Sequence, residues 1–149
     1  MLRIYRTNED KKKYLDLLLL GDEDEKMIDK YLFRAEIFLL DDGDGVKGIS
    51  AVTDEGNGVL EIKNIAVSPE CQGRGYGRKM INFIIDTYRG RYEYLEVGTG
   101  DSPLTVPFYE KCGFVRSRVK KNFFTDNYDH PIVECGVRLT DMVYFKMKL

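Results

Sequence analysis

Apolar residues recur along this chain at two spacings, which predict short strands alternating with amphipathic helices. The chain opens with a strand at residues 2–5, followed by a helix that begins at Glu9 and is capped by Thr7 or Asn8. A second helix is expected over residues 24–33. The apolar faces are Leu15, Leu18 and Leu19 in the first helix and Met27, Ile28, Tyr31 and Leu32 in the second.

Three apolar runs in the middle of the chain predict strands separated by turns. Residues 35–40 and 46–53 form the first two, joined by a glycine- and aspartate-rich turn over residues 41–45. A second turn, over residues 54–58, precedes a strand at residues 59–67. After a glycine-rich loop, a helix ending at Gly90 carries apolar residues at helical spacing, namely Met80, Ile81, Ile84, Ile85 and Tyr88.

The pattern then predicts a strand and a short helix. The strand covers residues 92–97, and the helix is opened by Ser102 and Pro103 and terminated by Gly113. Pro107 inside this helix has no N–H to donate, so we expect an irregular first turn.

Two strands complete the chain, at residues 114–124 and 137–147. A polar and aromatic loop over residues 125–136 separates them, with no repeat or low-complexity character. No composition shift or linker divides the sequence, so residues 1–149 are expected to form one domain.

Composition narrows the class of protein. At 149 residues, 43% of them hydrophobic and 32% charged, the chain is typical of a globular domain. Its longest apolar runs, such as Leu17–Leu20, are too short to span a bilayer, and no leader-like segment opens it. Cys71, Cys112 and Cys135 lack CxxC spacing and a nearby His, so we expect a reduced, cytoplasmic protein without disulfides or a metal.

The net charge of −2 has a separate consequence, because it provides no basic field for nucleic acid. We therefore expect no nucleic-acid partner, while the short apolar runs predict no membrane partner.

The loop between residues 72 and 79 is the strongest indication of function. Glycines at 73, 75 and 77 lie between a strand and a helix, where backbone N–H groups and the helix dipole attract anions. The spacing fits neither a Walker A loop nor the GxGxxG dinucleotide fingerprint. What remains is Gln72-x-x-Gly75-x-Gly77, which predicts a phosphate or pyrophosphate site.

This pattern resembles the (Q/R)xxGx(G/A) acetyl-CoA loop of the GNAT family of N-acetyltransferases. Further along, residues 107–114 (PFYEKCGF) resemble the FYxKxGF segment of the same family. The resemblance implies an α/β fold in which a mixed central sheet of about seven strands is flanked by helices on both faces. The expected element order, β-α-α-β-β-β-α-β-α-β-β, is that of the GNAT fold. It also implies transfer of the acetyl group of acetyl-CoA to a primary amine, without a metal.

The resemblance also implies which residues hold acetyl-CoA. Main-chain groups of Ile65 and Val67 are expected to meet the pantetheine arm as an added strand would. The full expected set is Ile65, Ala66, Val67, Gln72, Gly73, Arg74, Gly75, Tyr76, Gly77, Arg78 and Ser102. Arg78 and Lys79 have the alternative of being solvated surface cations. Many family members carry Asn where this chain has Gly98–Ser102, so Ser102 has the alternative of only capping the helix.

Two catalytic residues follow from the same resemblance. Tyr109, the tyrosine of FYxKxGF, is expected to protonate the coenzyme A sulfur; the alternative is a core tyrosine. A lysine-like amine with a pKa near ~10.4 is mostly protonated at neutral pH, so the transfer benefits from a general base. Glu61 matches the general-base glutamate of the histone-acetyltransferase branch by its distance before Gln72. Its alternative is a strand glutamate paired with Lys63. Cys112 has no activating partner, so direct attack in a ternary complex is preferred to an acyl-enzyme.

The acceptor is not identified by these motifs. His130, in the 125–136 loop, is a candidate for the acceptor site, and the acidic run over residues 22–25 could attract a cationic amine or be solvated. An acyl-CoA-binding sensor without catalysis and a purely structural protein remain alternatives. The family often dimerises through its sheet edges and C-terminal strands, so a homodimer is possible.

Overall fold

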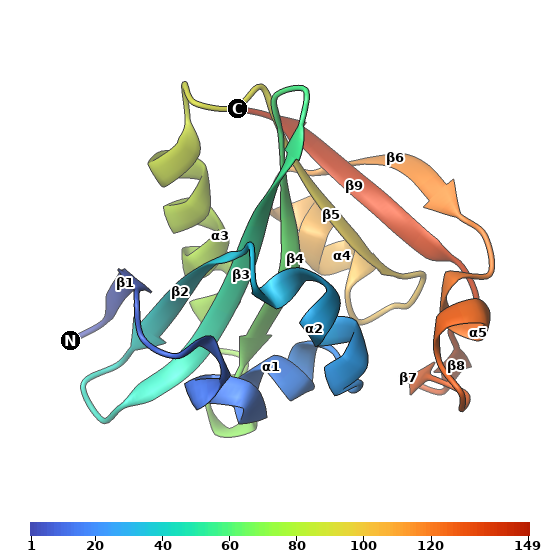
Figure 1. The fold of residues 1–149 in the computed structure, drawn as a ribbon, viewed down its shortest axis with the longest axis horizontal. Coiled ribbons are helices and arrows are strands. Elements are labelled where there is room, and N and C mark those ends of the chain that lie inside the picture. Colours follow the sequence, from blue (N-terminus) through green and yellow to red (C-terminus); the bar gives the residue numbers. More distant parts are fainter.

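A computed structural model describes all 149 residues and places a seven-stranded mixed sheet at the centre, in the order β1-β2-β3-β4-β5-β9-β6 (Figure 1). The sheet strands are β1 (Arg3–Thr7), β2 (Glu36–Asp41), β3 (Val46–Gly56), β4 (Val59–Val67), β5 (Tyr94–Gly100), β6 (Val115–Lys120) and β9 (Met142–Lys148). The helices are α1 (Leu15–Gly21), α2 (Glu25–Leu32), α3 (Tyr76–Tyr88), α4 (Val106–Lys111) and α5 (Phe123–Asn127), with 3-10 turns at Lys11–Tyr14 and Pro69–Cys71. A separate hairpin is formed by β7 (Val133–Glu134) and β8 (Val137–Arg138).

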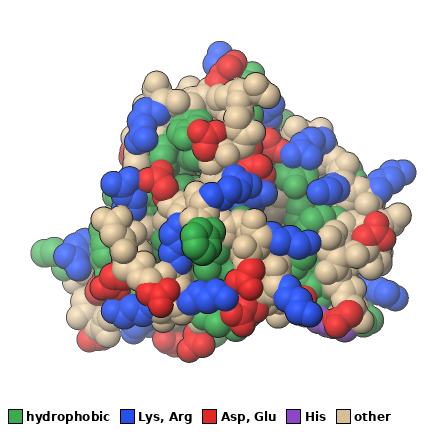
Figure 2. Space-filling view, viewed as in Figure 1, with side chains coloured by type: hydrophobic (Ala, Val, Ile, Leu, Met, Phe, Trp, Pro, Cys, Tyr) green, Lys and Arg blue, Asp and Glu red, His purple; other side chains and the backbone are tan.

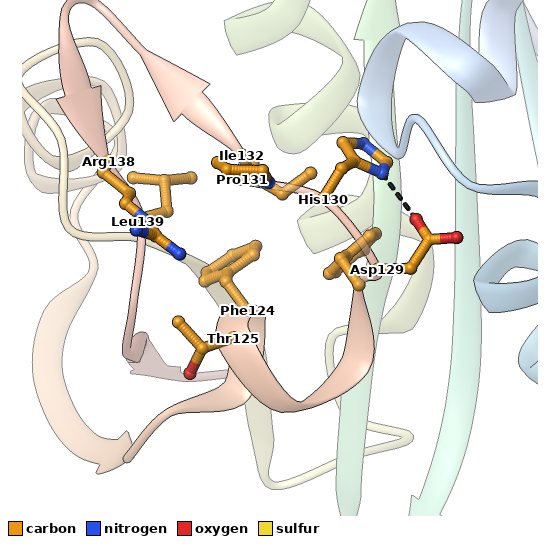
Figure 3. A pocket seen from close by; sticks show the side chains of 9 residues that line it. Phe124, Thr125, Asp129, His130, Pro131, Ile132, Arg138 and Leu139 are labelled. Atoms are coloured by element: carbon orange, nitrogen blue, oxygen red, sulfur yellow. Dashed lines mark hydrogen bonds and ion pairs between the residues drawn. The ribbon is translucent and has the colours of Figure 1, made fainter.

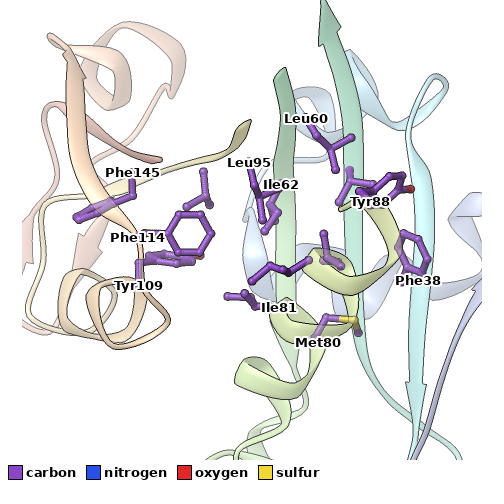
Figure 4. Packing of buried hydrophobic residues seen from close by; sticks show 14 of the residues in the cluster. Phe38, Leu60, Ile62, Met80, Ile81, Tyr88, Leu95, Tyr109, Phe114 and Phe145 are labelled. Carbon is purple, nitrogen blue, oxygen red and sulfur yellow. The ribbon is translucent and has the colours of Figure 1, made fainter. Parts of the chain in front are cut away.

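Helices cover both faces of the sheet because its central strands are apolar on both sides. Along β2, Ile37 and Leu39 pack with α1 and α2, whereas Phe38 and Leu40 pack with α3. Figure 4 shows the larger core, in which Tyr109 from α4 lies beside aromatic rings from the β6 and β9 side. The alternation of strand side chains therefore defines an α1/α2 face and an α3/α4 face. None of the helices combines the length and apolar character that a bilayer-spanning segment requires.

The sheet opens at its centre, between β4 and β5. These parallel strands pair only from Val59 to Ile62 and from Tyr94 to Val97, and beyond that point they diverge. The register of β3 and β4 shifts at the same level, because Ala51 is opposite Asn64 whereas Val52 is opposite Ile62. A bulge of this kind bends a strand and increases its twist, which turns the rest of β4 away from β5.

The predicted fold class is confirmed, and several elements match closely. Strand β4 has the predicted bounds, Val59–Val67. Helix α2 lies within the predicted range, and Asp24 caps it by accepting a hydrogen bond from the Lys26 N–H at 2.8 Å. The apolar face predicted for α3 is buried along its whole length.

The first helix starts later than predicted. A 3-10 turn over Lys11–Tyr14 precedes α1, and Asp10 rather than Thr7 or Asn8 caps that turn. The buried residues of α1 are Leu17 and Leu18, while the predicted Leu15 and Leu19 are half-buried and pack at the edge of the same core. The prediction was wrong because an α-helical period was applied across a segment that begins with tighter winding.

The region after α3 also departs from the prediction. Strand β5 covers Tyr94–Gly100 rather than residues 92–97, and α4 begins at Val106 rather than at Ser102 and Pro103. Pro107 consequently occupies the first turn of α4, where its missing N–H costs no helical hydrogen bond. A side chain at Gly100 would overlap Leu139 (2.4 Å from the nearest side-chain carbon), which explains glycine within this strand.

The C-terminal strands are shorter than predicted. Strand β6 ends at Lys120, because Asn122 adopts a left-handed backbone conformation (φ 58°) and starts α5. The expected loop over 125–136 contains part of α5 and most of the β7–β8 hairpin. That hairpin turns at Cys135 and Gly136, both with positive φ (50° and 76°), and β9 begins only at Met142.

The core should show the usual cost of a cavity. Ile84 on α3 is completely buried, so Ile84→Ala should lower the free energy of unfolding by about 2–5 kcal/mol. Phe33 is 95% exposed, so Phe33→Ala should change stability by no more than about 0.5 kcal/mol. Chemical denaturation of both variants tests this, and similar values for the two would contradict the assigned core.

Candidate active site

The divergence of β4 and β5 creates the principal cleft of the molecule. Its volume is about 680 Å³, and it extends from the end of β4 and its loop to α1, α2, α5 and the β7–β8 hairpin. Residues from both faces of the sheet line this cleft. Acidic and basic side chains are interspersed over the face seen in Figure 2, without a broad patch of either sign.

The loop between β4 and α3 presents unpaired backbone donors. No N–H group from Gly73 through Arg78 donates a hydrogen bond within the protein; the first helical bond runs from the Lys79 N–H to the Gly75 carbonyl. The dipole of the 13-residue α3 adds partial positive charge at the same place. This run of unpaired N–H groups lies where the sequence predicts an anion site, and such groups at a helix start attract anions.

The three glycines of this loop have different structural reasons. Gly73 and Gly75 adopt positive φ (84° and 80°), which side-chain-bearing residues rarely tolerate. Gly77 has ordinary helical geometry, but a Cβ there would lie 3.1 Å from the Phe108 ring. Gly77 therefore permits α4 to pack closely against the start of α3.

One edge of β4 is free beside this loop. The Ser68 N–H donates to the Lys47 carbonyl at 2.7 Å, so by strand alternation the backbone groups of Val67 and Ile65 point away from β3. Since β5 no longer pairs at this level, those groups face the cleft. The Gln72 side chain donates to the Val67 carbonyl at 3.2 Å and ties the loop to the end of the strand.

Tyr109 reaches the cleft from the α3/α4 face. It is 6% exposed and packs against the rings of Phe108, Phe114 and Phe145. Its hydroxyl has no hydrogen-bond partner in the protein, although the residue lines the cleft. Burial raises the pKa of Tyr109 far above its usual value, so the phenol keeps its proton and can act as a donor.

Glu61 reaches the cleft from the opposite face. Leu60 and Ile62 pack in the α3/α4 core, so the residue between them points to the α1/α2 face, where it is 7% exposed. Burial raises the pKa of Glu61, and the Lys63 ammonium, 3.1 Å away, partly offsets this rise. The pairing with Lys63 that the sequence left open is therefore present, in a residue that also lines the cleft.

Comparison with known proteins identifies the group to which this site belongs. A family model described as "Acetyltransferase (GNAT) domain" matches residues 34–116. An uncharacterized N-acetyltransferase of Bacillus subtilis, YvbK, is 33% identical over 99% of this chain and 97% of its own length. The chain belongs to the GNAT acetyltransferase family.

Solved structures agree with this assignment. A GNAT acetyltransferase from Elizabethkingia anophelis with acetyl-CoA bound has 34% identity and a TM-score of 0.94 over 99% of this chain and 98% of its own. A structure called IAA acetyltransferase from Bacillus cereus has 32% identity and a TM-score of 0.93 over both whole chains. This GNAT protein is accordingly an acetyl-CoA-dependent acetyltransferase.

Six of the predicted site residues of this GNAT protein line the cleft: Glu61, Ile65, Ala66, Val67, Gln72 and Tyr109. Ser102 is 3% exposed and lies behind the lining; its hydroxyl accepts the Leu104 N–H at 3.3 Å in the turn before α4, which is the capping alternative that the sequence left open. Thr105 faces the cleft instead, and donates to the Gly100 carbonyl at 3.2 Å. Arg74, Arg78 and Lys79 are exposed around the anion site without an ion-pair partner.

Asn64 is a residue of this cleft that the sequence did not reveal. It is 4% exposed, and its amide nitrogen donates to the Leu18 carbonyl at 2.9 Å and to the Tyr31 hydroxyl at 3.0 Å. Gly21 lies so close to Asn64 that a Cβ there would meet the amide oxygen at 2.2 Å. Asn64 thus attaches both α1 and α2 to β4 where the cleft begins, a role that depends entirely on contacts distant in sequence.

His130 lies at the edge of a smaller pocket, of about 230 Å³, beside the main cleft (Figure 3). Its Nδ1 is 2.7 Å from an Asp129 oxygen, and its Nε2 is 2.9 Å from a Glu23 oxygen. Ionised carboxylates only accept hydrogen bonds, so both contacts require the doubly protonated imidazolium. No group of three or more His, Cys, Asp and Glu side chains is arranged to hold a metal ion.

The charge of His130 should be visible in solution. The hydrogen bond to Asp129, and then that to Glu23, raises the pKa of His130 above its ordinary value of 6.5. Because the folded-state pKa is the higher one, the stabilisation by His130 is complete below the unfolded pKa and is lost as pH rises through the folded pKa. The melting-temperature difference between wild type and His130→Ala should therefore be larger at about pH 5.5 than at about pH 8.5. A difference that stays constant or grows with pH would contradict the charged pairing.

Proposed function

We propose that this acetyltransferase transfers the acetyl group of acetyl-CoA to a primary amine by direct attack in a ternary complex. The observation that carries the proposal is the placement of Tyr109 and Glu61 on opposite faces of one cleft, beside the free N–H groups of the glycine loop. A proton donor on the cofactor side and a proton acceptor on the other side are what such a transfer needs.

The residues present fit acetyl-CoA. The N–H groups from Gly73 to Arg78 would receive the pyrophosphate, and Arg74 and Arg78 stand exposed beside them. The free edge of β4 at Ile65 and Val67 would pair with the amides of the pantetheine arm, as an added strand does. When bound, acetyl-CoA supplies the activated acetyl group, and an arm lying along β4 leads from the loop into the cleft.

The chemistry then assigns a task to each side chain. Glu61 takes a proton from the acceptor ammonium, which leaves the nitrogen lone pair free to attack the thioester carbonyl carbon. The C–N bond forms and the C–S bond breaks, and the departing sulfur takes the phenolic proton of Tyr109. The second nitrogen proton leaves to solvent, and Tyr109 regains its proton from solvent. The raised pKa of Glu61 makes its carboxylate a stronger base for the first step, and the raised pKa of Tyr109 keeps the phenol protonated until the sulfur departs.

Acetyl-CoA should stabilise the fold through the glycine loop. At a concentration of 100 times Kd, binding adds about 2.7 kcal/mol, a rise in melting temperature of roughly 5–10 °C at this size. Gly75→Glu places a negative side chain and a strained backbone in the anion site and should remove the shift. Thermal melting with acetyl-CoA, coenzyme A and ATP tests this; the first two should act and ATP should not. An equal shift in Gly75→Glu would show that the loop is not the site.

The catalytic tyrosine and glutamate should differ in their pH behaviour. Tyr109→Phe and Glu61→Gln should each lower kcat by about 10²–10⁴ at neutral pH. The Glu61→Gln defect should shrink as pH approaches the amine pKa, near ~10.4, because the acceptor then loses its proton unaided. The Tyr109→Phe defect should persist through neutral pH and up to about pH 8, since below a thiol pKa of ~8.5 the departing sulfur still needs a proton.

A matched control for these variants is Glu110→Gln, which makes the same change on the exposed side of α4 next to Tyr109 and should leave kcat unaltered. Acetyl-CoA turnover with a panel of primary amines provides the measurement. Binding of acetyl-CoA without turnover of any amine would support the sensor alternative instead.

A further inference from the structure

Two hydrogen-bonded pairs join the opposite walls of the cleft on its α1/α2 face. The Tyr128 hydroxyl donates to Asp22 at 2.8 Å across a sequence separation of 106 residues, and His130 Nε2 contacts Glu23 at 2.9 Å. We call these two pairs the cross-cleft bridge. One wall is the end of α1 and the turn into α2; the other is the segment that follows α5, seen beside the α1–α2 region in Figure 3.

The bridge is built into its surroundings. Asp22 and Tyr128 are half-buried, and Tyr128 stacks on Phe124 with ring centroids 5.9 Å apart. Burial raises the pKa of Asp22, and the hydrogen bond from Tyr128 opposes that rise. A carboxylate that is partly removed from water keeps its charge at lower cost when it receives such a bond, so the pair stabilises the contact between the two walls.

Apolar and polar side chains share the surface beneath the bridge, and apolar ones come from both walls. Leu20, Met27 and Tyr31 contribute from the α1/α2 wall, and Phe124 from the opposite wall. The charged side chains that line the cleft are four acidic and four basic ones, so their formal charges balance. They are Asp22, Glu23, Glu61 and Glu134, and Lys30, Arg34, Lys63 and Lys120. A polycation therefore finds no excess of negative charge, whereas an amine with an apolar body finds both a base and a matching surface.

The geometry points to a small-molecule primary amine with an apolar body as the acceptor, with the cross-cleft bridge excluding amines attached to a polypeptide. This inference rests on the proposed function. The thioester arm would lie along the edge of β4, while the Glu61 side chain points to the α1/α2 face. The acceptor would therefore approach Glu61 from that face, which the bridge spans. A volume of about 680 Å³ for arm and acceptor together suits a small ligand, while a lysine or N-terminus on a folded protein must extend out through the bridged face.

The test compares three acceptors with the full-length protein: phenethylamine, spermidine, and a lysine-containing peptide with a blocked N-terminus. For wild type, kcat/KM for phenethylamine should exceed that for each of the others by at least about tenfold. Tyr128→Phe combined with His130→Ala removes both bridge contacts, so the advantage of phenethylamine over the peptide should fall at least about threefold relative to wild type, chiefly through the KM of the peptide.

The matched control is Asp129→Asn, which removes the partner of His130 on its own side of the cleft and leaves both bridge contacts. It should keep the wild-type preference. Equal use of the peptide by wild type, a preference for spermidine, or an unchanged ratio in the double variant with a normal melting temperature would overturn the inference. If the double variant does not fold, the ratio of kcat/KM values of phenethylamine to the other two acceptors in wild type still tests the inference. Absence of turnover with every amine would instead contradict the proposed function.

Discussion

The divergence of β4 from β5 after Ile62 is the constraint on which the site depends, because a strand edge inside a protein must find partners for its backbone groups. In an ordinary sheet, β5 would satisfy the edge of β4 at Ile65 and Val67. Here the bulge before Asn64 turns that edge toward an open cleft. The same divergence lets a side chain from each face of the sheet reach one space, which is how Tyr109 and Glu61 come to share it.

The other walls of the cleft depend on contacts between segments far apart in sequence. Asn64 attaches α1 and α2 to β4, and Leu139 lies against Gly100 where a side chain would not fit. The segment between β6 and β9 is thereby placed over the cleft, with Tyr128 and His130 extending toward α1 and α2. The acceptor side of the site is thus made by tertiary contacts, while the cofactor side is made largely by one continuous stretch of chain.

That difference explains how far the sequence alone could lead. From β4 to α3, strand alternation, glycine spacing and helical periodicity act locally, and the predicted bounds of β4 and apolar face of α3 are confirmed. Asn64 carried no local signal, because its partners are Leu18 and Tyr31. Ser102 lies where many family members carry Asn, and its hydroxyl accepts the Leu104 N–H in the turn before α4, which is the capping alternative that the sequence left open. The β7–β8 hairpin could have been recognised from Cys135 and Gly136 between two valine-containing pairs, but two-residue strands give almost no periodic pattern.

The candidate anion site at the start of α3 consists of main-chain N–H groups. Unlike the titratable side chains of the cleft, these groups do not change their protonation state with pH. Amide groups have no proton to gain or lose over the range in which His130 changes its charge. The attraction of the loop for an anion therefore stays constant over this pH range, whereas the charge at the opposite end of the cleft changes with the protonation of His130. Three glycines are required there, Gly73 and Gly75 by their backbone conformation and Gly77 by the nearby Phe108 ring. The side chains between these glycines can vary without removing the main-chain donors.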